Sequence, residues 1–332
     1  MRRPTRAVVG TVSLVVLAAG ALAGCTKSTV TPTAGAAVAY AAVGATESNP
    51  GDGVSPVDTA TGVVGRSIVV GTLPAAVALV PGGRSLLVAV KSDDQLVEVS
   101  TASGKVEGKV GVGLEPDAVT VTPDGSTALV ADFGDATVTV VHLPSLRAGP
   151  TVPVGRQPVA VAVTPDGTRA LVVNFQDGTL TPIALPSLIP GPPVPVGAEP
   201  VAVAVAHSGA EALVADFQTS DLTPVALPSL VPGPAVALGA NPTGIAIPAG
   251  STVAWVSAGD GVTPVSVSGG LVGTALPVGV PAECIAAGPP GRVWVCSGNR
   301  ALVEVDLASG HVVRRVGLDG IPAAVVVTGT PS

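Results

Sequence analysis

The sequence contains few charged residues, very few aromatic residues and little histidine. Charged types make up 12% of the 332 residues and aromatic types 2%, and there are three histidines. The formal net charge is −7, and a nucleic-acid partner would need clustered Lys and Arg to neutralise phosphates. We therefore expect no nucleic-acid partner. The motif C-x-x-C-H is also absent, which excludes haem attachment of that type.

Glycine, proline and small aliphatic residues are abundant instead. The chain has 42 Gly and 33 Pro, and 47% of its residues are hydrophobic, mainly Val and Ala. Frequent Pro and Gly together with β-branched Val disfavour long helices. The apolar content is too high, and the charge too sparse, for a disordered chain. The composition predicts an all-β globular protein with a large core.

The N-terminal segment has the layout of an export signal. Arg2, Arg3 and Arg6 precede an uncharged apolar stretch that ends in small residues. The sequence Leu-Ala-Gly-Cys at 22–25 resembles the lipobox of bacterial lipoproteins. That resemblance implies a signal peptide at 1–24, a lipid on Cys25, and a protein held at the extracytoplasmic face of the cell membrane. A plain signal peptide or an uncleaved anchor is the alternative, and residues 25–36 are expected to form a flexible tether.

The rest of the chain, from 37 to 330, is a repeat with a period near 42 residues. A proline follows the end of each Val-Gly-type segment, and successive prolines are 42, 42, 42, 42, 39 and 41 residues apart. The prolines are Pro74, Pro116, Pro158, Pro200, Pro242, Pro281 and Pro322. Self-similarity at this period is typical of repeat architectures.

Each unit contains four short β segments separated by turns. In the unit that begins at Pro116, the expected strands are 118–122, 127–131, 136–141 and 150–155. The sequence Pro-Asp-Gly at 123–125 predicts the first turn, because Pro presets φ and Gly accepts a positive φ. Four antiparallel strands in such a unit are typical of a propeller blade.

The two ends of the chain complete one another. Residues 323–328 read as an innermost strand without partners after it, whereas 37–43, 53–58 and 66–71 read as three strands without an innermost strand before them. Joined together they form one blade. We therefore predict a seven-bladed β-propeller of four-stranded antiparallel blades, closed by pairing of the C-terminal strand with the N-terminal strands.

Segments such as EPDAVTVTPDGSTALVADFGDATVTVV resemble YVTN-type (YncE-like) repeats over about residues 37–330. This resemblance implies an often exported seven-bladed propeller, a frame that serves binding proteins, surface-layer proteins and a few enzymes. The chain departs from the family's YVTN core, where it has ALVAD or ALVVN.

Propeller loops sort onto two faces, and one face collects the polar variation of the repeats. On it we expect the residues before the repeat prolines and the ends of the second strands, each end followed by a phenylalanine. These candidate ligand- or partner-binding residues are Glu115, Asp132, Phe133, Gln157, Asn174, Phe175, Glu199, Asp216, Phe217 and Asn241. The alternative is structural: the phenylalanines pack blade against blade, and the acidic residues cap turns.

Cys284 and Cys296 remain once Cys25 is assigned to lipid. They flank a turn near residue 290, which places them on the first two strands of one blade. In an oxidising compartment we expect a disulfide, and two buried free thiols are the alternative.

We expect a monomeric, non-catalytic binding scaffold for a protein, peptide or envelope ligand, with no cofactor. One alternative is a metal-dependent lactonase, hydrolase or lyase at the channel mouth, with a cation such as calcium on Glu115, Asp132, Glu199 and Asp216. A histidine-based site lacks its parts there, because all three histidines fall toward the opposite face. The second alternative is a structural envelope protein.

Overall fold

The computed structural model describes residues 37–44, 53–227, 229–268 and 270–329. The predicted signal peptide (1–24), Cys25 and the tether (25–36) lie outside the described residues. Within the described ranges, no helix combines the length and the apolar character that crossing a membrane would require. The one helical element there is a short 3₁₀ turn, η1 (Lys91–Asp93).

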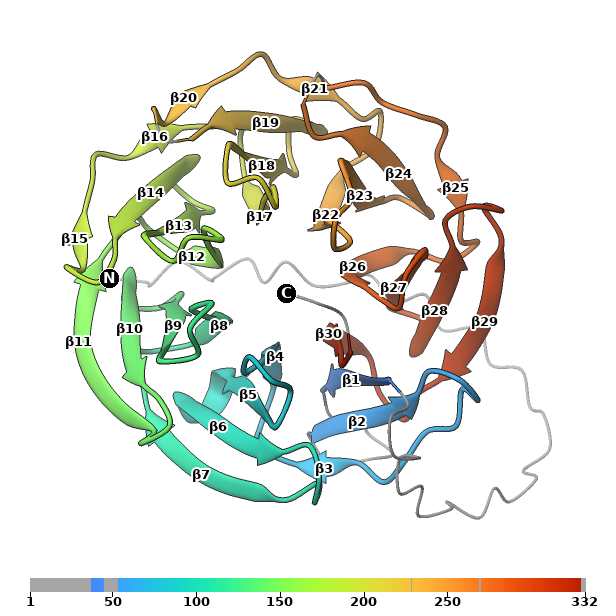
Figure 1. Ribbon diagram of the computed structural model, residues 1–332, viewed down its shortest axis with the longest axis horizontal. Helices are drawn as coiled ribbons and strands as arrows, with labels where there is room; N and C mark the ends of the chain where they lie inside the picture. The colour runs from blue at the N-terminus through green and yellow to red at the C-terminus, as the bar shows by residue number, and fades with distance from the viewer. Residues whose placement is uncertain (1–36, 45–52, 228, 269, 330–332) are drawn as a thin grey trace, which may run out of the picture.

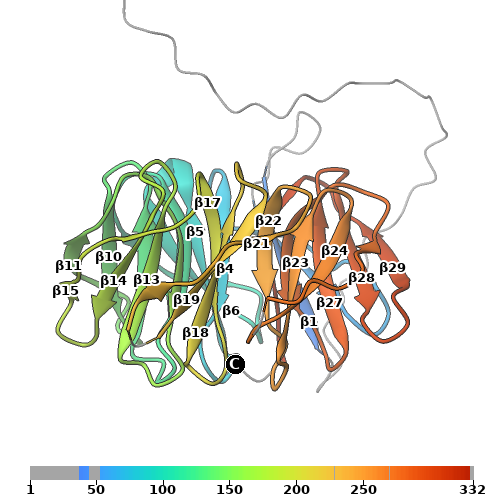
Figure 2. The same cartoon turned by 90° about the horizontal axis from the view of Figure 1, so that it is seen from above.

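The chain forms a ring of seven blades around a central axis (Figure 1). Each blade is an antiparallel sheet whose first strand is innermost and whose fourth strand lies at the rim. Seen edge-on, the ring is a thick disc with loops at its two flat faces (Figure 2). The predicted seven-bladed, four-stranded propeller is confirmed.

The blades are numbered in chain order, and the strands of each blade run from the axis outward. Blade 1 consists of β30 (Pro322–Val327), β1 (Val38–Val43), β2 (Gly53–Asp58) and β3 (Ile68–Val69). Blade 2 consists of β4 (Pro74–Leu79), β5 (Ser85–Val90), β6 (Gln95–Ser100) and β7 (Val106–Gly111). Blade 3 consists of β8 (Pro116–Val121), β9 (Thr127–Asp132), β10 (Thr137–His142) and β11 (Arg147–Pro153).

Blades 4 and 5 have an outer strand in two pieces. Blade 4 consists of β12 (Pro158–Val163), β13 (Arg169–Asn174), β14 (Thr179–Ala184), β15 (Ile189–Pro190) and β16 (Val194–Pro195). Blade 5 consists of β17 (Pro200–Val205), β18 (Glu211–Asp216), β19 (Asp221–Ala226), β20 (Val231–Pro232) and β21 (Val236–Ala237). Prolines in these outer segments lack the N–H that a continuous ladder requires.

Blades 6 and 7 complete the ring. Blade 6 consists of β22 (Pro242–Ala246), β23 (Val253–Ala258), β24 (Gly261–Ser266) and β25 (Leu276–Pro277). Blade 7 consists of β26 (Ala282–Ala287), β27 (Arg292–Ser297), β28 (Ala301–Asp306) and β29 (Val312–Gly317). Cys284 on β26 is the cross-strand partner of Cys296 on β27, and a disulfide joins the two residues.

The two ends of the chain close the ring within blade 1. Strand β30 pairs antiparallel with β1, and Ala41 lies opposite Val325. The hydroxyl of Thr328 accepts a hydrogen bond from the N–H of Val38 at 2.7 Å. The predicted closure of the ring is confirmed, and it leaves no innermost strand without a partner in its blade.

The core is divided among the junctions between blades. Seven hydrophobic clusters of described residues each join two neighbouring blades, and Val, Leu and Ala supply most of their side chains. Trp294, which is fully buried, lies in the cluster between blades 7 and 1, together with Val325. Each second strand is covered on both sides by neighbouring blades. All seven second strands are buried at every position after the first, namely β1, β5, β9, β13, β18, β23 and β27.

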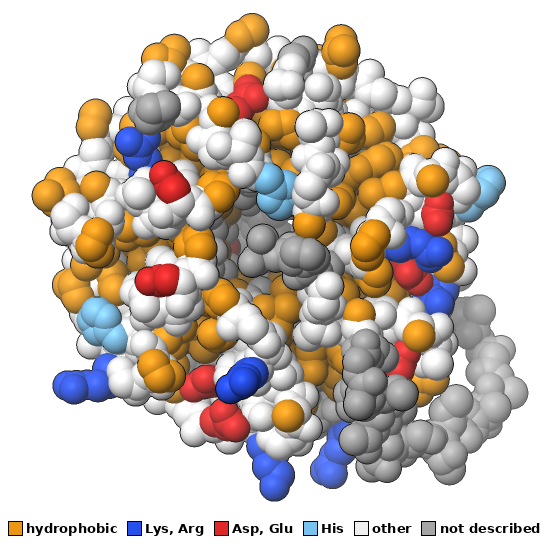
Figure 3. All heavy atoms as spheres, viewed as in Figure 1, with side chains coloured by type: hydrophobic (Ala, Val, Ile, Leu, Met, Phe, Trp, Pro, Cys, Tyr) orange, Lys and Arg blue, Asp and Glu red, His pale blue; other side chains and the backbone are white. Residues whose placement is uncertain are grey.

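The loops divide between the two faces of the disc. One face carries the turns that join the first to the second strand in blades 2 to 7 and the third to the fourth strand in each blade. Figure 3 shows this face, where scattered charged side chains are separated by apolar and uncharged ones. The other face, which we call the site face, carries the loops between the second and third strands of blades 2 to 7 and the connections that enter the next blade.

A substitution in the closing strand β30 tests how strongly the stability of the ring depends on that strand. Val325 of β30 is buried between blades 7 and 1, and the Val325→Asp variant would place a carboxylate there. We expect the free energy of unfolding to fall by about 3–5 kcal/mol, because a buried charge would have no partner. Urea unfolding followed by circular dichroism measures this loss.

The matched control is Ala323→Asp, because Ala323 is an exposed residue of the same strand. It should leave the unfolding midpoint nearly unchanged. Equal midpoints for the two variants would contradict a closing role for the buried face of β30.

Candidate functional site

Three adjacent blades end their second strand with a polar residue at the site face. These residues are Asp132, Asn174 and Asp216, and each has 0% exposed surface. The repeat pattern predicts these residues as candidate ligand- or partner-binding groups on one loop face, with a structural role in capping turns as the alternative, and their burial agrees with the structural role. Because neighbouring blades cover a second strand on both sides, its last side chain is buried as well.

Each of these buried side chains forms hydrogen bonds with threonine hydroxyls of its own blade, although one oxygen of Asn174 and one of Asp216 have no partner among the described residues. The carboxylate of Asp132 accepts the hydroxyls of Thr137 at 3.0 Å and Thr139 at 2.7 Å. It also accepts the N–H of Gly113 at 3.1 Å. Because its oxygens are taken by groups of its own blade, Asp132 acts as a structural cap.

The next two blades repeat this arrangement with small changes. The Asn174 amide donates to the hydroxyls of Thr179 at 3.0 Å and Thr181 at 2.8 Å. The Asp216 carboxylate accepts the hydroxyl of Thr223 at 2.6 Å. Amide and carboxylate therefore fit the same position.

A glycine of the incoming connection packs directly on each buried polar group. A Cβ added at Gly113 would lie 2.5 Å from the Asp132 side chain, and one added at Gly155 would lie 2.6 Å from that of Asn174. Gly197 stands in the same relation to Asp216, with 2.5 Å. These close approaches explain why a Val-Gly sequence recurs before the repeat prolines.

Burial disfavours ionisation of the two aspartates. It raises the pKa of Asp132 to about 6, although the threonine and glycine hydrogen bonds act in the opposite direction. Burial also raises the pKa of Asp216 to about 6, against the effect of Thr223. Nearby Asp135 and Asp221 add smaller contributions of the same sign as burial.

The residues before the repeat prolines are linked to the phenylalanines through the backbone. Glu115, Gln157 and Glu199 have φ between 51° and 54°, the left-handed region. Their carbonyl groups accept, in the same order, the N–H groups of Phe133 at 3.1 Å, Phe175 at 2.9 Å and Phe217 at 3.0 Å. The structure thus brings each predicted acidic or amide residue next to a predicted phenylalanine of the same blade.

The phenylalanines themselves are only partly covered. Phe133 and Phe175 are half-buried, and Phe217 is 37% exposed. Asn241, an exposed residue of the following connection, donates its side-chain amide to the carbonyl of Phe217 at 2.9 Å. The three rings are therefore neither core residues nor free side chains, and each presents part of its surface on the site face.

One ring is already occupied by a cation from the neighbouring blade. The Nζ atom of Lys91, in η1, lies 4.5 Å from the centroid of the Phe133 ring. The same ammonium forms an ion pair with Asp117 on β8. Sequence reasoning missed both residues, although Lys91 follows the end of β5 as Phe133 follows the end of β9.

A pocket of about 350 Å³ opens between blades 4 and 5 on the site face. Two of its lining residues, Phe175 and Glu199, were predicted, and the others were not. The lining consists of Phe175, Gln176, Asp177, Gly178, Ala198, Glu199 and Gln218. Asp177 is bound to Arg156, whose backbone N–H and guanidinium lower the pKa of its carboxyl group.

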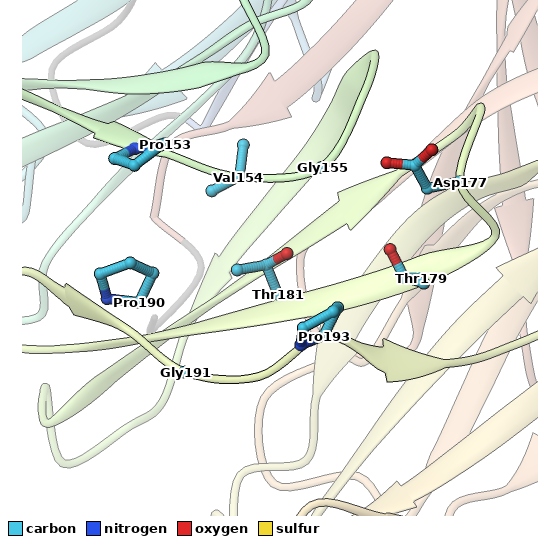
Figure 4. A pocket seen from close by; sticks show the side chains of 9 residues that line it. All are labelled: Pro153, Val154, Gly155, Asp177, Thr179, Thr181, Pro190, Gly191 and Pro193. Atoms are coloured by element: carbon cyan, nitrogen blue, oxygen red, sulfur yellow. The ribbon is translucent and has the colours of Figure 1, made fainter.

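A larger groove of about 520 Å³ runs along the rim between blades 3 and 4 (Figure 4). It follows from the gap between β15 and β16, where Gly191 donates to the carbonyl of Pro182 at 2.8 Å instead of continuing the ladder. Prolines and threonines dominate its lining, with Asp177 as the one ionisable residue. The groove is therefore a concave surface with few side chains that could form ion pairs or transfer protons.

The four carboxylates that the metal-dependent alternative requires do not form a cluster in the structure. Among the described residues, no group of three or more His, Cys, Asp or Glu side chains is placed to hold a metal ion. Asp132 and Asp216 are buried in different blades, and Glu115 and Glu199 belong to separate connections. The described part of the chain thus does not meet the geometric condition for the metal-dependent alternative.

Comparisons with known proteins support the fold. No family model matches the chain, and no curated protein matches it. A functionally unknown protein from Desulfotomaculum acetoxidans superposes with a TM-score of 0.77 at 15% identity, over 89% of this chain and 99% of that one. Hydrazine synthase from Kuenenia stuttgartiensis gives 0.69 at 16% identity, over 76% and 88%. Virginiamycin B lyase from Staphylococcus aureus gives 0.65 at 10% identity, over 74% and 84%. At these identities the likeness concerns the propeller fold alone.

The buried aspartates predict an unusual pH dependence. Between the unfolded-state pKa, about 3.9, and the folded-state value of about 6, the native protein binds more protons than the unfolded chain. The contribution of Asp132 to stability is therefore present at low pH and is lost as the pH rises through 6. In the Asp132→Asn variant, which copies Asn174, we expect this loss to disappear.

The measurement is the difference in unfolding free energy between Asp132→Asn and the parent protein at pH 4 and pH 7. It should increase with pH by up to about 3 kcal/mol, as a shift of two pKa units implies. Asp124→Asn is the control. Its difference from the parent should decrease with pH, because turn hydrogen bonds lower the pKa of exposed Asp124. A difference that does not change with pH would contradict the assignment.

Proposed function

We propose that this protein is an exported, lipid-anchored propeller of the YVTN-repeat type that binds a protein, peptide or other envelope ligand through its site face. The resemblance of its repeats and of the segment at 22–25 supports this assignment. In this proposal the lipid on Cys25 holds the propeller at the extracytoplasmic face of the membrane. Three acyl groups on one cysteine would bind the membrane more firmly than one chain alone, which gives only marginal anchoring.

One observation carries the binding role. The chain has three phenylalanines in all, and they occupy the same position on three successive blades. All three present part of their surface on one face, and Phe175 lines a pocket with Glu199. Partly exposed aromatic side chains beside polar groups are typical of interaction sites.

We propose binding without a catalytic step. The carboxylates with the most perturbed pKa, Asp132 and Asp216, are fully buried and accept threonine hydroxyls of their own blades. The three histidines lie at turns of the opposite face: His142 ends β10, His207 lies between β17 and β18, and His311 precedes β29. We further propose that the protein acts as a monomer.

The binding role is tested by the triple variant Phe133→Ser, Phe175→Ser, Phe217→Ser in the full-length lipidated protein. Partner capture from envelope extract should fall strongly, because the aromatic surface is removed. Each substitution should cost well below the roughly 3–5 kcal/mol of a core phenylalanine. Quantitative mass spectrometry of captured proteins and a thermal unfolding curve measure the two effects.

The matched control replaces three exposed apolar residues of the rim by serine, namely Ile189, Val231 and Leu271. This control should capture partners as the parent does. If the phenylalanine variant captures equally well, or if it unfolds, the binding surface is refuted in favour of a structural role.

Lipid anchoring has its own test. The Cys25→Ser variant should lack the lipid mass and leave the membrane fraction, because the sulfur that carries the diacylglycerol is gone. Intact-mass measurement and membrane fractionation report both properties. A Cys284→Ser, Cys296→Ser variant is the control and should keep the lipid. Lipid mass retained in Cys25→Ser would exclude the assignment.

A further inference from the structure

The protein holds one of its own ammonium groups between an aromatic ring and a carboxylate. Lys91 extends from blade 2 over the ring of Phe133 in blade 3, and its ion pair with Asp117 fixes the ammonium there. The side chains of Lys91 and Asp117 are only 28% and 24% exposed. Such partial desolvation strengthens both the cation–π contact and the ion pair.

The three blades that follow have a phenylalanine at the repeat position that Lys91 occupies in blade 2. Lys91 directly follows the last residue of the second strand, and Phe133, Phe175 and Phe217 hold the same position on the next three blades. The site face thus presents an arc of one cation followed by three aromatic rings. Among the described residues, Phe133 alone has a cation placed over its ring.

The pocket beside Phe175 has the remaining parts of an ammonium site. Glu199 lines it from the connection that enters the next blade, whereas Asp117 belongs to the same blade as the Phe133 ring, so the two sites share a ring and a carboxylate but not the carboxylate's position in the repeat. No hydrogen bond or ion pair of the Glu199 carboxylate occurs in the described ranges. The amide oxygens of Gln176 and Gln218 can accept further N–H groups, whereas Asp177 is occupied by Arg156.

We propose that this pocket binds the side-chain ammonium of a lysine presented by a partner polypeptide. The ring of Phe175 contacts the ammonium and its methylene groups, and Glu199 forms the ion pair. A formal charge of −7 on the chain favours the approach of a cationic segment. This inference rests on the proposed binding role of the site face and names the chemistry of its ligand.

The direct test is binding of the peptide acetyl-Gly-Lys-Gly-amide to the full-length protein in detergent. Ligand-observed NMR titration should show saturable binding with contacts at the lysine methylene next to nitrogen. The same peptide with an acetylated lysine nitrogen has no charge and should bind at least about threefold more weakly, the minimum expected from a cation–π contact and an exposed ion pair. Equal binding of the two peptides overturns the proposal.

Two variants locate the site, and a third controls for charge. Phe175→Leu and Glu199→Gln should each weaken peptide binding about threefold or more. Glu107→Gln changes the net charge equally on an exposed residue of β7 and should not alter the affinity. Unchanged affinity in both site variants, or an equal loss in Glu107→Gln, overturns the proposal.

The internal lysine provides a gain-of-binding test. Adding Lys91→Met to Glu199→Gln vacates the ring of Phe133 and frees Asp117, so peptide binding should return. Adding Asp117→Asn as well should remove it again. If Lys91→Met restores nothing, the parallel between the two sites is refuted and the proposal falls with it.

The peptide and capture experiments together distinguish the ammonium site from the wider binding face. If the lysine peptide does not bind but the phenylalanine triple variant still loses its partners, the ammonium site is wrong and the binding face stands. If the peptide binds while capture is unaffected by the triple variant, the binding role of the face is wrong.

Discussion

The pairing of β30 with β1 is the constraint on which the rest of the structure depends. A single blade is a four-stranded sheet with apolar side chains on both surfaces, and it is covered only when a neighbour lies on each side. In a ring every blade has two neighbours, whereas an open arc would leave two large apolar surfaces in water. The hydrophobic cluster between blades 7 and 1 is the junction that closure creates.

Closure of the ring also determines which polar residues are buried and structural and which are exposed and could contact a ligand. A second strand lies between two neighbouring blades, so its final residue is buried whichever way the side chain points. Asp132, Asn174 and Asp216 therefore serve as internal caps bonded to threonines of the third strand. The residue one position later has left the sheet, and there the repeats vary freely between lysine, phenylalanine and glycine.

This difference between buried strand-end positions and the loop positions that follow them explains where a binding site can arise in a repeat built from few residue types. The frame reuses Val, Ala, Gly and Pro at positions set by packing, and a change at a loop position costs little stability. Lys91 and the three phenylalanines occupy one such position on consecutive blades. Their arc lies over blades 2 to 5, while the equivalent residues of blades 6 and 7, Gly259 and Gly298, have no side chain.

Much of the fold could be predicted from the sequence, because proline spacing and turn residues mark strand ends directly. The expected strands 118–122 and 127–131 compare with β8 (Pro116–Val121) and β9 (Thr127–Asp132). The burial of Asp132 could not be read from the same pattern, since a polar residue at a strand end is ordinarily exposed. It depends on coverage by two neighbouring blades and on the close approach of Gly113. The contact of Lys91 with Phe133 likewise depends on how adjacent blades are spaced.

The most direct test of ring closure is a designed cross-link between its two ends. Ala41 of β1 and Val325 of β30 lie opposite each other, so cysteines at these two positions should form a disulfide in the oxidised protein. Mass mapping of non-reduced peptides detects this bond. Cysteines at Ala41 and Val327, which is opposite Ala39, are the off-register control. A cross-link from Ala41→Cys to Val325→Cys alone is the predicted result; its absence, or equal cross-linking of the control pair, would contradict the closed ring.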